Sequence, residues 1–287
     1  YVYKVFSKEG KPTSDSKLLE ALDNAVADRC DVVNMSLGSA GESEGRDENP
    51  YYDVMKRMAK ANVMVVAAIG NSGTNGVKNP WPGSTPGIVE DVFCVGATDD
   101  RKYTNGITIA DFSSVGMTAD GLFKPEIAAP GVKIMSTYLK KQGGYASGSG
   151  TSMSSPSVAG LVALIKSAKP RWSIQQIKSS LMNNAAIIMN EKNNEPITFS
   201  LQGAGQARVD KAIMTEAFLN PQAFVVEQTA SISKEVSIEN ANETDLVISS
   251  IQAEVYGLHT EDAIKITLPQ EDIVLGAYQS KKDKNSV

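Results

Sequence analysis

The chain has 287 residues, which is long enough for one large core or for a large core and a small domain. Its net charge of −5 argues against nucleic acid as a main partner, and no apolar run is long enough to span a membrane. The two cysteines, Cys30 and Cys94, have no metal-ligand spacing and form no disulfide framework, so we expect two buried thiols.

The first hundred residues alternate strand-like and helix-like patterns. Strands are predicted at 2–6, 31–36, 63–68 and 92–97, and helices at 16–29 and 51–61. The strands are nearly continuous apolar runs, as in parallel strands covered on both faces. The alternation predicts the α/β class, with right-handed βαβ units in a doubly wound, mostly parallel sheet. Because 2–6 is expected to be a buried strand entered in mid-fold, we expect the chain to be a fragment or a processed product.

A loop rich in glycine and serine at 143–149 leads into a helical pattern. The stretch 150–160 reads Gly-Thr-Ser-Met-Ser-Ser-Pro-Ser-Val-Ala-Gly, and Pro156 is compatible with a first helical turn. Ser152 is therefore expected at the N-terminus of a buried helix, where the helix dipole favours the negative charge that develops in acyl transfer. On local sequence alone, a simple N-cap role for Ser152 is equally compatible.

In the last third of the chain, the sequence pattern changes from helices to short alternating runs. Ser173 and Gln176 form a capping-box pattern before a helix to about 183, and a last helix is predicted at 209–219. Short alternating runs follow, with a predicted hairpin turn at 240–243. We therefore predict a first domain over 1–220 and a small, antiparallel β-sandwich-like domain over 221–287.

Four motifs resemble those of the subtilisin-like serine proteases, the subtilase family, and they follow the same order. They are Asn34–Gly38, Gly70–Asn71, Ala128–Gly131 and Gly150–Gly160. The resemblance covers about residues 1–215 and implies the C-terminal two-thirds of a subtilisin-like catalytic domain whose N-terminal part is missing. Ser157 departs from the family, which very often has a non-catalytic histidine there, so this change bears on helix packing.

The resemblance implies that Ser152 is the nucleophile and that the amide of Asn71 donates to the oxyanion, with the backbone N–H of Ser152 as second donor. Without Ser152, a turn asparagine would be the preferred reading of Asn71. The resemblance also implies that one segment pairs with extended substrate and another walls the primary specificity pocket. Those two segments are Ser36, Leu37 and Gly38, and Ala68, Ile69 and Gly70. It further implies a cis bond between Trp81 and Pro82.

The general base and the group that orients it are not found in the sequence. The only histidine, His259, lies in a predicted turn of the β domain, where a solvated role is expected. The family order Asp, His, Ser places the other two motifs N-terminal to this chain. No metal site is expected, since the acidic loop 42–48 lacks ligand spacing and reads as a solvated loop that could alternatively border the cleft. Calcium is implied only for a full-length parent.

The sequence thus favours a serine endopeptidase fragment that is inactive by itself. Its expected partners are a polypeptide substrate and the missing N-terminal catalytic segment, with neither nucleic acid nor a membrane span. The alternative is a catalytically inactive, subtilase-like binding or regulatory protein, and a third reading is one piece of a nicked protease. The resemblance implies a secreted or cell-surface location. An isolated fragment is expected to aggregate, because apolar faces would be exposed.

Overall fold

A five-stranded sheet forms the centre of the protein in the computed structural model, which describes residues 1–7, 14–40, 49–73, 83–101, 106–116, 118, 120–223, 233–252 and 271–286. Its strands are β1 (Val32–Met35), β3 (Met64–Ala68), β5 (Val92–Asp99), β6 (Thr108–Ile109) and β7 (Ile127–Pro130). The pairs β1–β3, β3–β5 and β5–β7 are parallel, whereas β6 joins β5 antiparallel. The predicted α/β architecture with a mostly parallel sheet is confirmed.

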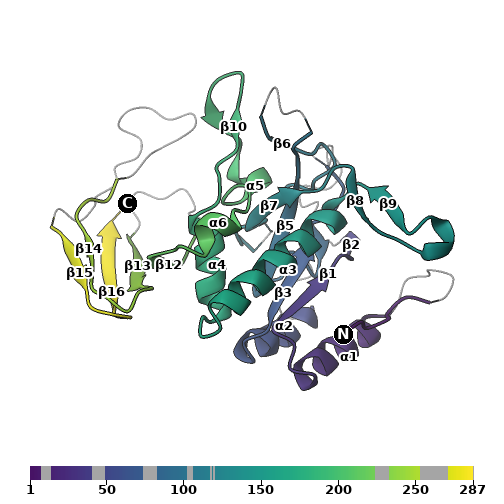
Figure 1. Ribbon diagram of the computed structural model, residues 1–287, viewed down its shortest axis with the longest axis horizontal. Coiled ribbons are helices and arrows are strands. Elements are labelled where there is room, and N and C mark those ends of the chain that lie inside the picture. The colour runs from purple at the N-terminus through teal and green to yellow at the C-terminus, as the bar shows by residue number, and fades with distance from the viewer. Residues whose placement is uncertain are drawn as a thin grey trace.

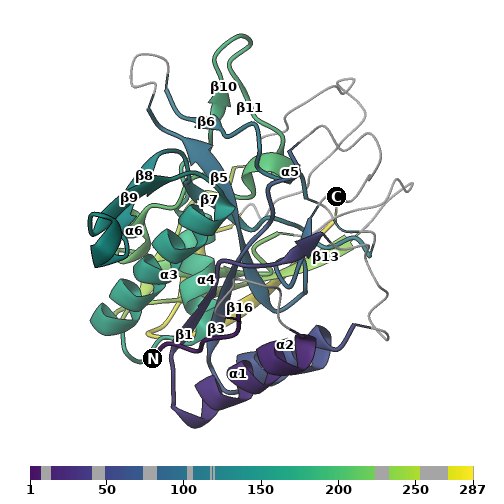
Figure 2. The same cartoon turned by 90° about the vertical axis from the view of Figure 1, so that its right-hand side faces the viewer.

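Helices cover both faces of this sheet (Figures 1 and 2). Helices α1 (Asp15–Ala27) and α2 (Tyr51–Lys60) lie on one face, and α3 (Thr151–Ala168) and α4 (Ile174–Asn183) lie on the other. Successive strand residues point to opposite faces, so Val65 packs in the core under α1 and α2, while Val66 packs in the core under α3 and α4. Two covered faces explain why the strand sequences are continuously apolar.

A buried charge cluster lies where α4 meets the sheet. The Glu126 carboxylate accepts hydrogen bonds from Lys124 Nζ at 2.8 Å, from Lys178 Nζ at 2.9 Å and from the backbone N–H of Cys94 at 2.8 Å. Lys124 also donates to the carbonyl oxygens of Val89 and Val92. The side chains of Lys124 and Glu126 are only 1% and 4% exposed, so these bonds replace the lost hydration of both charges.

The predicted N-terminal strand, Val2–Phe6, is wrong. Residues 1–7 form no strand, and Tyr1 and Val2 are 87% and 96% exposed. A strand needs a neighbouring backbone to complete its hydrogen bonds, and among the described residues β1 pairs only with β3. The segment is instead tied to the body through Tyr3, whose hydroxyl donates to Asp28 Oδ2 at 2.5 Å.

The C-terminal third holds antiparallel strands at the end of the molecule opposite the N-terminus (Figure 1). Strand β12 (Ala217–Asn220) pairs with β13 (Ser233–Asn240), which pairs with β16 (Ser280–Ser286), and β14 (Leu246–Ile248) pairs with β15 (Ile273–Leu275). The helix predicted at 209–219 stops at Ala212, since the following residues form β12. The hairpin predicted at 240–243 is also wrong, because β13 and β14 belong to different sheets.

Shorter elements complete the described chain. They are β2 (Ser39–Ala40), β4 (Ser84–Thr85), β8 (Ile134–Thr137), η1 (Lys140–Gln142), β9 (Tyr145–Gly148), β10 (Met189–Asn190), β11 (Glu195–Pro196), α5 (Phe199–Gln202) and α6 (Val209–Ala212). Strands β8 and β9 form a hairpin that runs directly into α3. Within the described part of the chain, no helix has the length and apolar character needed to cross a membrane.

Candidate functional site

Ser152 lies in the first turn of α3. The helix begins at Thr151, and its N-cap is Gly150, which has φ of +154°. The N-cap alternative for Ser152 is therefore wrong. Pro156 lies in the second turn and not in the first, so it lacks the N–H that would bond to the carbonyl four residues earlier, which is that of Ser152.

The side chain of Ser36 supplies the hydrogen bond that Pro156 cannot make. Ser36 Oγ donates to the carbonyl oxygen of Ser152 at 2.8 Å, and Ser152 Oγ donates to the carbonyl oxygen of Ser36 at 3.3 Å. These reciprocal bonds join the loop after β1 to the start of α3. The structure thus brings together Ser36 and Ser152, which are 116 residues apart in the sequence.

Two further side chains extend this contact, and the sequence reasoning missed both. Asn34 Nδ2 donates to Ser36 Oγ at 3.0 Å, and Ser155 Oγ donates to Asn34 Oδ1 at 2.9 Å. The hydroxyls of Ser36 and Ser155 also lie 3.1 Å apart. The spacing of two residues between Asn34 and Ser36 was the available signal, since it places both side chains on one side of an extended segment.

Asn71 follows the end of β3 and meets the same helix start. Its Oδ1 accepts hydrogen bonds from the backbone N–H of Thr151 at 2.9 Å and from Thr151 Oγ1 at 3.0 Å. Thr151 Oγ1 in turn accepts a hydrogen bond from the backbone N–H of Gly70 at 3.3 Å. The ends of β1 and β3 therefore converge on the first turn of α3, as expected at the carboxyl edge of an α/β sheet.

The glycines at positions 38 and 70 are required by the chain itself. A Cβ on Gly70, whose φ is +117°, would meet Ser114 Oγ at 2.9 Å and would also collide with the Ser84 hydroxyl. A Cβ on Gly38 would lie 2.9 Å from Ser84 Cβ. Their close neighbour is β4, which pairs with β2 just after Gly38.

The remaining predicted substrate residues lie beside these glycines. Ala68 and Ile69 are buried. Ser36 is half-buried against α3, and Leu37 is half-buried against the core under α1 and α2. The described residues contain no group of three or more metal-ligating side chains. His259, the acidic loop 42–48 and the Trp81–Pro82 bond lie outside the described residues, so the predictions made for them stay predictions.

Comparison with known proteins relates this arrangement to one family. The family model described as "Subtilase family" matches residues 1–205. The chain is 32% identical to the minor extracellular protease Vpr of Bacillus subtilis and 36% identical to Subtilisin DY of Bacillus licheniformis. These alignments cover 79% and 64% of this chain, but only 31% and 60% of the two relatives. The solved structure of the prenylagaramide maturation protease PagA superposes with a TM-score of 0.60 at 27% identity, over 73% of this chain and 70% of that one.

Proposed function

The chain belongs to the subtilase family, and from this premise we propose that it carries the nucleophile half of a serine endopeptidase. In this proposal Ser152 Oγ attacks the carbonyl carbon of a peptide bond, and a base takes the hydroxyl proton. The tetrahedral oxyanion collapses to an acyl-enzyme as the protonated amine leaves, and water then releases the acid. The substrate is a polypeptide, in keeping with the proteases among the relatives.

The observation that carries the proposal is the orientation of the Asn71 amide. Both hydrogen bonds recorded for Asn71 Oδ1 come from Thr151, the residue next to Ser152. With the oxygen occupied, the amide NH₂ of Asn71 remains as a donor beside the nucleophile. The N–H of Ser152 lies in the first helical turn, where no carbonyl of the same helix can accept it. These two donors form the proposed oxyanion hole.

Extended substrate is proposed to lie between the two strand ends. Residues Ser36, Leu37 and Gly38 would pair with its backbone, and Ala68, Ile69 and Gly70 would wall the primary pocket. Ser152 Oγ now donates to the carbonyl of Ser36, so substrate binding would require that weak 3.3 Å bond to be exchanged.

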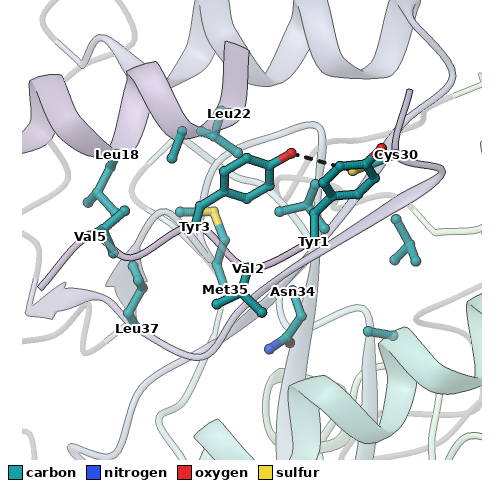
Figure 3. A pocket seen from close by; sticks show the side chains of 14 residues that line it. Tyr1, Val2, Tyr3, Val5, Leu18, Leu22, Cys30, Asn34, Met35 and Leu37 are labelled. Atoms are coloured by element: carbon teal, nitrogen blue, oxygen red, sulfur yellow. Dashed lines mark hydrogen bonds between the residues drawn. The ribbon is translucent and has the colours of Figure 1, made fainter. Parts of the chain in front are cut away.

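The base and its orienting carboxylate are proposed to come from a polypeptide segment that completes the sheet beside β1. An open groove of about 420 Å³ runs along β1 between α1 and residues 1–5 (Figure 3). Its walls are mostly apolar and include Leu18, Val33 and Met35, whereas the polar side chain of Asn34 lies at its edge. An unpaired strand edge next to an apolar groove is suited to receiving another strand.

The proposal extends to the rest of the molecule. In it, residues 1–220 form a partial catalytic domain and residues 221–287 a small β domain, whose strand β13 pairs with β12 at the end of the first part. Secretion is proposed because the Bacillus relatives named above include an extracellular protease. Calcium is proposed only for a full-length parent, as the resemblance implies.

A chimera tests the catalytic proposal directly. The N-terminal catalytic part of Subtilisin DY, joined to residues 1–287, should restore hydrolysis of a fluorogenic peptide, whereas the chain alone should not turn over. Ser152→Ala should abolish the restored activity. Asn71→Ala should lower kcat about 10²–10³-fold, a range known from the matching residue of subtilisin, a member of this family. Ser157→Ala is the matched control and should keep full activity, since its hydroxyl donates to the Met153 carbonyl within α3.

The same chimera separates the alternative function. A folded chimera that binds peptide but does not cleave it would contradict the protease proposal and favour a catalytically inactive binding or regulatory protein. The nicked-protease reading predicts a second, noncovalently held polypeptide, which intact mass measurement of the purified material would detect.

A further inference from the structure

We propose that the β8–β9 hairpin (134–148) is a docking finger for an anionic lipid surface. This site goes beyond the proposed catalytic function and does not depend on it. The hairpin projects from the body of the molecule on the side away from the C-terminal sheets (Figure 1). Its tip is the short helix η1, and its second strand leads into α3.

Large apolar side chains are concentrated on this projection and remain exposed. They are Met135 (66% exposed), Tyr138 (56%), Leu139 (53%) and Tyr145 (67%). Four exposed apolar side chains within eleven residues are unusual for a soluble surface, where such residues are normally scattered singly. Tyrosine is suited to a membrane interface, because its ring enters the apolar layer while its hydroxyl stays at the headgroups.

All the charged side chains of the hairpin and its flanking residues are basic. Residues 131–150 contain Lys133, Lys140 and Lys141 and no acidic residue, although the whole chain has a net charge of −5. All three lysines are exposed, and two of them directly follow Leu139 at the tip. Lysine stems can lie along an apolar layer while their ammonium groups remain with lipid phosphates. Apolar tip residues flanked by cations match an interface with anionic lipids.

The shape of the hairpin favours a lipid surface over an acidic protein. A stable protein interface buries about 800 Å² on each partner and needs a complementary face. A projecting hairpin of two four-residue strands offers little such area, whereas insertion into a fluid interface needs no shape complementarity.

Vesicle co-sedimentation tests the proposal with the full chain, whether or not it is catalytically active. The chain should bind vesicles that contain phosphatidylglycerol and should not bind vesicles of phosphatidylcholine alone, and added salt should weaken the binding. Each lysine near an anionic surface contributes about fivefold to partitioning, so Lys140→Glu with Lys141→Glu should weaken it at least about 25-fold. Tyr138→Ser with Leu139→Ser should weaken it about tenfold or more.

Matched variants at other surface sites test whether vesicle binding depends specifically on the hairpin. Lys56→Glu with Lys60→Glu on α2 makes the same charge change, and Val247→Ser with Val274→Ser removes an equally exposed apolar pair. Both controls should bind vesicles like the unchanged chain. The proposal is overturned if the unchanged chain does not bind, if the hairpin variants bind normally, or if the controls lose as much. Capture by poly-glutamate without vesicle binding would overturn it in favour of an acidic protein partner.

Discussion

At the scale of single residues, Glu126 is the anion that pairs with one buried cation, Lys124, and one half-buried cation, Lys178. The change Glu126→Gln would keep the shape of the side chain but leave the ammonium groups of Lys124 and Lys178 without an anion. We expect the free energy of unfolding to fall by about 3–5 kcal/mol, as measured by urea denaturation. Glu195→Gln is the control, since Glu195 is exposed and the change should cost less than about 0.5 kcal/mol. Equal losses in the two variants would contradict this role.

The two cysteines differ in environment, although the sequence had predicted two buried thiols. Cys94 is fully buried in β5, and burial raises its pKa far above that of an ordinary thiol. Cys30 is half-buried, with its sulfur 3.8 Å from the Tyr3 hydroxyl. A raised pKa keeps the Cys94 thiol protonated at pH 8–9, and only the thiolate reacts with disulfide reagents.

Thiol labelling at pH 8.5 should therefore find one reactive cysteine in the folded chain and two in denaturant. Cys30→Ser should remove the folded-state signal. The raised pKa also makes stability fall progressively as the pH rises above the ordinary thiol pKa of about 8.5, because the unfolded chain then loses a proton that folded Cys94 keeps. Rapid labelling of Cys94 in the folded Cys30→Ser variant would contradict its burial.

At the scale of elements, the helix caps provide a paired test. Ser173 at the start of α4 accepts a hydrogen bond from the N–H of Gln176 and completes the predicted capping box. Ser14, at the start of α1, makes no side-chain cap bond. Ser173→Ala should therefore lower the free energy of unfolding by about 1 kcal/mol, and Ser14→Ala should leave it nearly unchanged. Equal effects in chemical denaturation would show that the cap bond is not the cause.

The elements that sequence reasoning placed correctly are those with local signals. Helix α4 was marked by its capping box, and β3 and β5 by unbroken apolar runs. The errors lie where a distant partner decides the conformation. Residues 217–219 were predicted to be helical but belong to β12, because β13 pairs with them. Residues 2–6 read as strand, but the described chain offers them no partner.

The same difference between local signals and distant partners applies to the candidate site. The motifs around Ser152 and Asn71 could be read from the sequence, since each follows a strand end or begins a helix. The contact of Ser36 with the Ser152 carbonyl could not, because it depends on a crossing between segments 116 residues apart. Pro156 held the indirect signal, since a proline four residues after Ser152 leaves that carbonyl in need of a donor.

At the scale of the whole molecule, the C-terminal strands are firmly attached to the rest of the fold, whereas the edge of the central sheet at β1 is open among the described residues. Two hydrogen bonds join α4 to the C-terminal strands: Ser179 Oγ accepts from the Leu219 N–H at 3.0 Å, and Gln176 Nε2 donates to Glu239 at 2.7 Å. Just before α4, the ring of Trp172 meets the ring of Phe218 edge to face, with centroids 4.9 Å apart. The opposite side has an open strand edge on β1 and the apolar groove beside it. Local opening should therefore begin at β1 and not at the C-terminal strands.

The open side also determines how the isolated chain should behave in solution. An exposed strand edge beside apolar surface can pair with a second molecule, so we expect the chain alone to form oligomers or aggregates at micromolar concentration. Light scattering coupled to size exclusion would measure this. The chimera with the N-terminal part of Subtilisin DY covers β1 in the proposed arrangement, and it should elute as a monomer under the same conditions. A monodisperse, cooperatively melting monomer of the unmodified chain would contradict the need for a partner segment, because it would mean that β1 and its groove are stable when left open.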